Sequence, residues 1–139
     1  KLNRAVVDYQ QKVTEQEEVT NEVDINNTKK RILTYIRNEL VPIPIEDIAY
    51  IYTENTITYV MCIDGKRTTS NLSLDELFSQ LDETYFFRAN RQFIIAIASI
   101  DTIVKYGNNQ LKIVVTPNSE TNIIISKNRA ALFKQWLNF

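Results

Sequence analysis

The stretch FFRANRQFII, residues 86–95, is the part of the sequence from which we infer both the fold and a candidate site. It places two arginines and an asparagine between two phenylalanines and an apolar run. In an extended segment, Phe87 and Ala89 would lie on one face and Arg88 and Asn90 on the other, because strand side chains alternate. Two interpretations are open: a solvated strand edge that charge protects from aggregation, or a binding surface.

The length and composition are those of one domain with a short appendage. The chain has 139 residues, enough to bury a core without disulfides or metals. Its single cysteine, Cys62, lies in an apolar run and is predicted to be a buried thiol, which is typical of the cytoplasm. No apolar run approaches the roughly 20 residues that cross a bilayer, so we expect no membrane partner. Because the chain begins at Lys1, we expect a fragment of a longer protein.

Several kinds of catalytic site are excluded by composition. The sequence has no histidine, which removes Ser-His-Asp and Cys-His catalysis and the commonest metal ligand. Gly65 and Gly107 stand too far apart for a Walker loop or a dinucleotide fingerprint. We therefore expect no catalytic residue, no metal, no cofactor and no enzymatic activity.

Residues 1–28 differ from the rest of the chain. One narrow helical stripe is formed by Leu2, Val6, Tyr9 and Val13. An acidic, polar stretch follows it. Residues 1–28 carry three basic and six acidic side chains, leaving thirteen basic and eleven acidic for residues 29–139. The pattern predicts a helix and a linker before a domain at 29–139.

The pattern from Lys29 onward is that of strands. β-Branched and aromatic residues dominate, and Pro42 and Pro44 indicate an edge strand. Turn residues predict hairpins or connections at Asp64-Gly65, Gly107-Asn108-Asn109 and Pro117-Asn118-Ser119. We expect a mainly β domain.

Two helices are predicted within this domain. In NLSLDELFSQLD, residues 71–82, Ser73 and Glu76 match a capping box. In SKNRAALFKQWLNF, residues 126–139, Ser126 is a candidate N-cap. Its helical repeat consists of Leu132, Phe133, Trp136 and Leu137.

The succession of FFRANRQFII, ASIDTIVKY, LKIVV and IIISKNRAALFKQWL resembles the LytTR family of bacterial DNA-binding output domains. The resemblance covers about residues 29–139 and implies small stacked antiparallel sheets with two short helices. It implies that loops, not a recognition helix, reach into the DNA grooves. It also implies a preceding receiver domain, to which residues 1–28 would contribute the last helix and linker, and a sensor histidine kinase as partner.

The resemblance assigns DNA contacts to three segments. The family's signature pair falls on Asn90 and Arg91, and the small polar residue that follows falls on Gln92. Two departures bear on sequence preference: Asn90 replaces the usual histidine, and Ala96 stands where an asparagine commonly ends the strand. Arg88 falls at the position of the family's structural arginine, so we expect its side chain to brace this segment.

The other two segments are the start of the last helix and a turn. The family's basic pair falls on Lys127 and Asn128, next to Arg129, and a further contact is expected at Asn55 or Thr56.

The chemistry of these side chains is compatible with DNA. Arginine can bind guanine, and asparagine or glutamine adenine, through paired hydrogen bonds. The predicted base-reading residues are Asn55, Thr56, Asn90, Arg91, Gln92 and Asn128. Lys127 and Arg129 are the predicted phosphate-binding residues. Lys66, Arg67 and Lys105 are further phosphate candidates, or ordinary surface charge.

The leading hypothesis is sequence-specific binding of double-stranded DNA by the output domain of a response regulator, with loops in the major groove and a possible homodimer on DNA. A net charge of −1 is unusual for a nucleic-acid binder, but the acidic excess lies in residues 1–28. The alternative is a protein-interaction module that uses an exposed β edge or the N-terminal helix.

Overall fold

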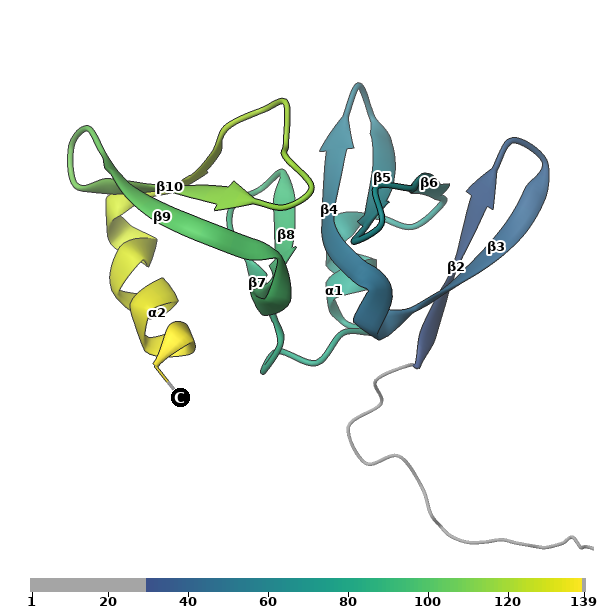
Figure 1. The fold of residues 1–139 in the computed structure, drawn as a ribbon, viewed down its shortest axis with the longest axis horizontal. Coiled ribbons are helices and arrows are strands. Elements are labelled where there is room, and N and C mark those ends of the chain that lie inside the picture. Colours follow the sequence, from purple (N-terminus) through teal and green to yellow (C-terminus); the bar gives the residue numbers. More distant parts are fainter. Residues whose placement is uncertain (1–29, 139) are drawn as a thin grey trace, which may run out of the picture.

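The computed structural model describes residues 30–138, so the predicted N-terminal helix and linker lie outside the described residues. The fold is mainly β, as predicted, with all strand pairs antiparallel (Figure 1).

A seven-stranded sheet has the order β3-β2-β6-β5-β4-β8-β7, and a three-stranded sheet has the order β11-β10-β9. The strands of the larger sheet are β2 (Arg31–Ile36), β3 (Glu39–Pro44), β4 (Ile48–Glu54), β5 (Ile57–Cys62), β6 (Arg67–Ser70), β7 (Phe86–Arg88) and β8 (Phe93–Ala96). Those of the smaller sheet are β9 (Ile100–Tyr106), β10 (Gln110–Val115) and β11 (Ile123–Ile125). The helices are α1 (Leu74–Phe78) and α2 (Lys127–Leu137), with 3₁₀ turns η1 (Ile45–Asp47) and η2 (Ile97–Ser99).

The hairpin turns use residues that tolerate left-handed backbone. Between β9 and β10, Asn108 and Asn109 have φ of 61° and 64°, as the two central residues of a tight hairpin require. The predicted turn between β5 and β6 also forms, but only Gly65 takes a positive φ, 93°. Asp64 instead accepts a hydrogen bond from the Lys66 amide at 2.9 Å, which closes the turn through its side chain.

The two helices begin at the predicted residues. Ser73 accepts from the Glu76 amide at 3.1 Å, and the Glu76 carboxylate accepts from the Ser73 amide at 2.9 Å, which confirms the capping box. Ser126 is at the N-cap of α2, but its side chain makes no capping hydrogen bond. Of the helical repeat on α2, Phe133 and Trp136 are buried, whereas Leu132 is 50% exposed.

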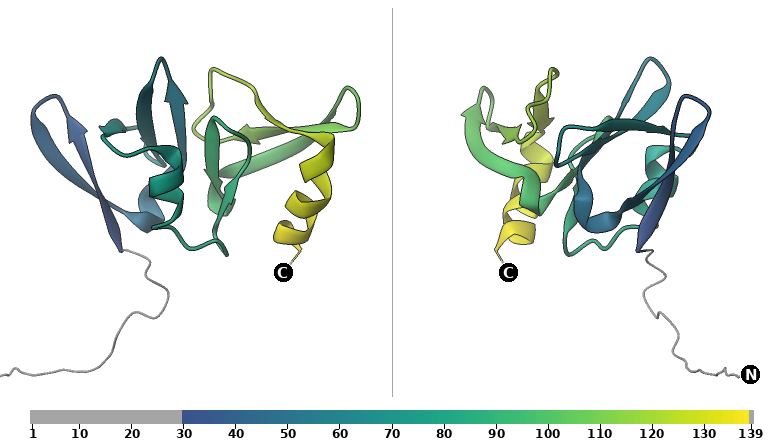
Figure 2. Two further views of the ribbon diagram at one scale, coloured as in Figure 1. Left: turned by 180° about the vertical axis from the view of Figure 1, so that it is seen from behind. Right: turned by 45° about the vertical axis from the view of Figure 1, so that its right-hand side comes forward.

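The central strands of the larger sheet are covered on both faces, and Figure 2 shows helices or strands on either side of them. On one side lies the α1 core, which includes Phe86 and Ile94; on the other lies the α2 core, which includes Phe87 and Ile95. Alternate residues of β7 and β8 therefore enter different cores, which accounts for the apolar run FII. Cys62 is buried in the α1 core, as predicted.

This two-sided burial corrects the expectation of a polar solvent face around residues 87–90. Arg88 and Asn90 are partly buried, and their side chains are hydrogen-bonded within the protein.

Candidate nucleic-acid interface

Three connecting segments lie in the upper half of the molecule in Figure 1. They are the β4–β5 turn (55–56), the β7–β8 loop (89–92) and the β11–α2 junction (126–128), and together we call them the loop edge. Side-chain and backbone hydrogen bonds join the β7–β8 loop to both neighbours.

Asn90 joins the β7–β8 loop to β11. Its side-chain amide donates to the carbonyl oxygen of Ile124 at 2.9 Å. Its side-chain oxygen accepts from the backbone amides of Gln92 at 2.8 Å and Phe93 at 3.0 Å. This is the local bonding by which asparagine stabilises turns, extended here by a contact to a distant strand.

Gln92 joins the same loop to the end of β4. Its side-chain amide donates to the carbonyl oxygen of Thr53 at 2.9 Å, while its own carbonyl accepts from the Thr53 amide at 3.0 Å. The predicted base-reading residues Asn90 and Gln92 are therefore turned into the protein by these contacts, and both are only partly exposed.

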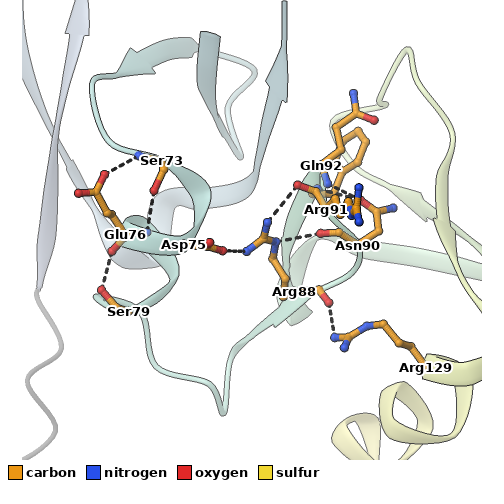
Figure 3. A network of polar contacts seen from close by, with 10 residues as sticks. Ser73, Asp75, Glu76, Ser79, Arg88, Asn90, Arg91, Gln92 and Arg129 are labelled. Carbon is orange, nitrogen blue, oxygen red and sulfur yellow. Dashed lines mark hydrogen bonds and ion pairs between the residues drawn. The ribbon is translucent and has the colours of Figure 1, made fainter. Parts of the chain in front are cut away.

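Arg88 holds the loop from below, between the loop and α1 (Figure 3). Its Nε donates to the carbonyl oxygen of Asn90 at 2.8 Å, and Nη2 donates to that of Arg91 at 3.0 Å. Nη1 forms an ion pair with Asp75 in the first turn of α1. These contacts link the loop to α1, and the role of Arg88 as a brace stays a prediction. Sequence analysis missed Asp75, because an acidic residue in a first helical turn is ordinary.

Arg129 differs from the expectation of a phosphate-binding side chain. Its Nη2 donates to the carbonyl oxygen of Arg88 at 2.6 Å, and its guanidinium lies 5.0 Å from the centre of the Phe87 ring. The guanidinium is thus engaged with β7, as the labelled side chains in Figure 3 show.

The remaining predicted residues on the loop edge face solvent. The exposed residues are Asn55, Thr56, Arg91, Lys127 and Asn128. Asn55 and Thr56 have φ of 52° and 66° and form the tip of the β4–β5 hairpin. Within residues 30–138, no hydrogen bond or ion pair occupies the Arg91 side chain. The structure therefore brings together exposed amides, a guanidinium and an ammonium.

The three further phosphate candidates are dispersed. Lys66 follows the turn at the opposite end of β5 from Asn55, about 20 Å away for a strand of six residues. Arg67 donates to the Tyr52 hydroxyl at 3.1 Å and lies 4.5 Å from the centre of the Tyr59 ring. The hydrogen bond with Tyr52 raises the pKa of Arg67.

Lys105, by contrast, is exposed near the tip of the β9–β10 hairpin. It pairs with Leu111 of β10, which pairs with Ile125 next to the β11–α2 junction. Lys105 therefore lies at the same end of the small sheet as Lys127.

Within the described part of the chain, no group of three or more acidic or cysteine side chains is placed to hold a metal ion. Neither α1 nor α2 is long and apolar enough to cross a membrane.

Comparison with known proteins identifies the family and the fold. Residues 38–138 match the family model of the LytTr DNA-binding domain. The chain belongs to the LytTR family of DNA-binding domains. A LytTr DNA-binding domain from a Bacillus cereus protein described as a methyl-accepting/DNA response regulator has the same fold. Its TM-score is 0.70 at 22% identity, over 80% of this chain and 99% of that one.

Two curated relatives contain a segment similar to this LytTR domain. They are the heme-containing CO-sensing transcriptional regulators RcoM 1 and RcoM 2 of Paraburkholderia xenovorans (strain LB400), each 26% identical over 107 residues. The match covers 77% of this chain but 39% of either relative. The LytTR family is a class of DNA-binding domains of transcription regulators, not a class of enzymes.

Proposed function

We propose that this LytTR domain binds double-stranded DNA sequence-specifically, with the loop edge facing the major groove. One observation carries the proposal: the β7–β8 loop is held by Arg88, Asn90 and Gln92, while the side chain of Arg91 at its centre is exposed. A donor on a loop that is already ordered loses little conformational freedom on binding, which favours affinity and specificity.

Each exposed residue has a chemical role in this proposal. Arg91 can donate two parallel hydrogen bonds to guanine, and Asn55 and Asn128 can pair with adenine. Lys127, in the first turn of α2, suits a phosphate, because a helix N-terminus also favours anions. We assign Asn90 and Gln92 to the support of the loop, since their amide groups are engaged by protein atoms.

We further propose that the domain is the output part of a response regulator. Residues 1–28 would then be the last helix and linker of a receiver domain, and a sensor histidine kinase would be its partner. The charge pattern of residues 1–28 supports a linker, and the description of the Bacillus cereus protein as a response regulator supports this architecture. Two copies would bind as a homodimer on spaced half-sites.

Selection of bound duplexes from a random pool tests DNA binding and specificity together. We expect enrichment of a short motif by the native chain. Arg91→Ala should weaken binding to that motif by about 1–3 kcal/mol while leaving binding to random duplex nearly unchanged. A pool that shows no enrichment would remove the proposal. Equal losses on motif and random DNA would remove the base-reading role of Arg91 alone.

A further inference from the structure

Strand β9 is an open sheet edge of a kind that folded proteins usually protect. It forms one side of the three-stranded sheet, and Figure 1 shows it at the front of the molecule with no strand along its outer edge. Within residues 30–138, its backbone hydrogen bonds to other strands are those to β10. Its outer row of amide and carbonyl groups is therefore available for pairing.

The other three sheet edges are protected. Strand β3 contains Pro42 and Pro44, which lack the amide hydrogen that a new strand would need. Strands β7 and β11 have three residues each, too few for extended pairing. Strand β9 has seven residues, IDTIVKY, and no proline.

The side chains of β9 are unusually exposed for their composition. Ile103 is 38%, Val104 43% and Tyr106 44% exposed. Because Ile103 and Val104 are adjacent in the strand, they point to opposite faces, so apolar surface is exposed on both sides of the edge. A paired strand would cover both.

We propose that β9 pairs antiparallel with β9 of a second copy of this chain, with Ile103 on the two-fold axis. This register places Asp101 of each chain opposite the partner's Lys105. Because of the two-fold symmetry, two equivalent ion pairs form. Shifting the centre to Thr102 or Val104 separates the charged residues, so the sequence of β9 matches itself in this register.

The two charged residues are not committed elsewhere in the described chain. Asp101 and Lys105 are both exposed, and neither forms an ion pair within residues 30–138. The register of β9 against β10 shifts at its first residues, and Asp101 has no partner residue on β10. Lys105 alone would repel the lysine of a second copy. Asp101, four positions earlier, makes the charges of this edge complementary to those of the same edge in the second copy.

This dimer would combine the two three-stranded sheets into one six-stranded sheet, β11-β10-β9 continuing into the partner's strands in reverse order. A contact of this size is small, so we expect association at high protein concentration, weakening as salt screens the ion pairs. The pairing can be measured without DNA, so its failure and that of the DNA-binding proposal can be told apart.

A charge-swap experiment tests the register. In sedimentation equilibrium, we expect the native protein to form dimers as its concentration is raised to about millimolar. Asp101→Lys or Lys105→Asp alone should weaken the dimer about tenfold, because both places in the interface then hold like charges. Mixing the two variants should restore association as a heterodimer, because every pair is again of opposite charge. A native chain that stays monomeric, or a mixture that stays monomeric, would overturn the proposal.

Cross-linking provides a second measurement that does not depend on the charged residues. Ile103→Cys should form a disulfide-linked dimer on mild oxidation, because antiparallel partners have Cα atoms about 5 Å apart. Val104→Cys is the matched control, since its two copies would be about 8 Å apart, too far for a disulfide. Equal cross-linking of both variants would contradict the register.

Discussion

The side-chain amide of Asn90 donates a hydrogen bond to the carbonyl oxygen of Ile124 at 2.9 Å, across 34 positions of sequence. This contact fixes the β7–β8 loop to β11, immediately before the start of α2. It makes the spacing between Arg91 and Lys127 a property of the folded domain. A surface that reads DNA needs such fixed spacing, because hydrogen bonds to base edges tolerate little displacement.

Asn90→Ala should destabilise the domain by about 1–3 kcal/mol, because it leaves one carbonyl and two amides without their partner. Urea unfolding measures this change. Asn128→Ala is the matched control: this asparagine is exposed, and its loss should change stability by less than about 0.5 kcal/mol. If the two variants are equally stable, Asn90 does not support the loop.

Arg88→Lys should cost about 1–3 kcal/mol, because lysine lacks the forked donors that reach the carbonyls of Asn90 and Arg91. Asp75→Asn should cost at most about 1 kcal/mol, since the Asp75 side chain is 87% exposed and its ion pair is largely solvated. Thermal unfolding of both variants compares them. If Asp75→Asn loses more stability than Arg88→Lys, the ion pair stabilises the loop more than the hydrogen bonds to the backbone do.

Arg129→Ala and Lys127→Ala should affect different properties, although the two cations are only two positions apart. Arg129→Ala should lower stability by about 1–3 kcal/mol, because it removes the contact with Phe87 and the hydrogen bond to the Arg88 carbonyl. Lys127→Ala should leave stability unchanged but reduce the salt dependence of DNA affinity by about one unit of slope.

Urea unfolding and a salt titration of DNA binding distinguish these two roles. A stable Arg129→Ala protein with reduced salt dependence would return Arg129 to the phosphate-binding group.

Tyr50 should make the domain sensitive to alkaline pH. Burial raises the pKa of its hydroxyl from 10.0 to about 12. The folded state therefore retains this proton where the unfolded state releases it. Its contribution to stability is present below pH 10 and is lost as the pH rises toward 12, by up to about 2–3 kcal/mol.

The control for this effect is Tyr50→Phe, which also loses the hydrogen bond to the Asn118 carbonyl at 3.2 Å. The free energy of unfolding of Tyr50→Phe should fall less between pH 10 and 12 than that of the native protein. Parallel loss in both proteins would assign the alkaline transition to other groups.

Local features of the fold followed directly from the sequence. The capping box of Ser73 and Glu76 and the β9–β10 turn at Asn108 and Asn109 both formed where predicted. In these cases the interacting groups lie within a few residues of one another, so the chemistry of a short segment is sufficient. Helical spacing alone does not indicate that Leu132 is exposed, because the rest of the protein covers a narrower stripe of α2 than its apolar residues span.

The candidate site was only partly predictable. The resemblance to the LytTR family pointed to the segments that form the loop edge, and their residue types suit base edges and phosphates. It did not distinguish Arg91, which is exposed, from Asn90, whose amide binds Ile124. The partners of Asn90 and Gln92 lie 34 and 39 positions away, and no local pattern indicates them.

The sequence by itself determined the mainly β character, the position of the turns and helices, and the family to which FFRANRQFII points. Only the tertiary structure decided how that stretch is used. Packing between two cores buries alternate side chains of β7 and β8 on both faces, so Arg88 and Asn90 must find partners within the protein. Because a partly buried polar group is costly unless it is hydrogen-bonded, these residues hold the loop, and Arg91 is left facing solvent.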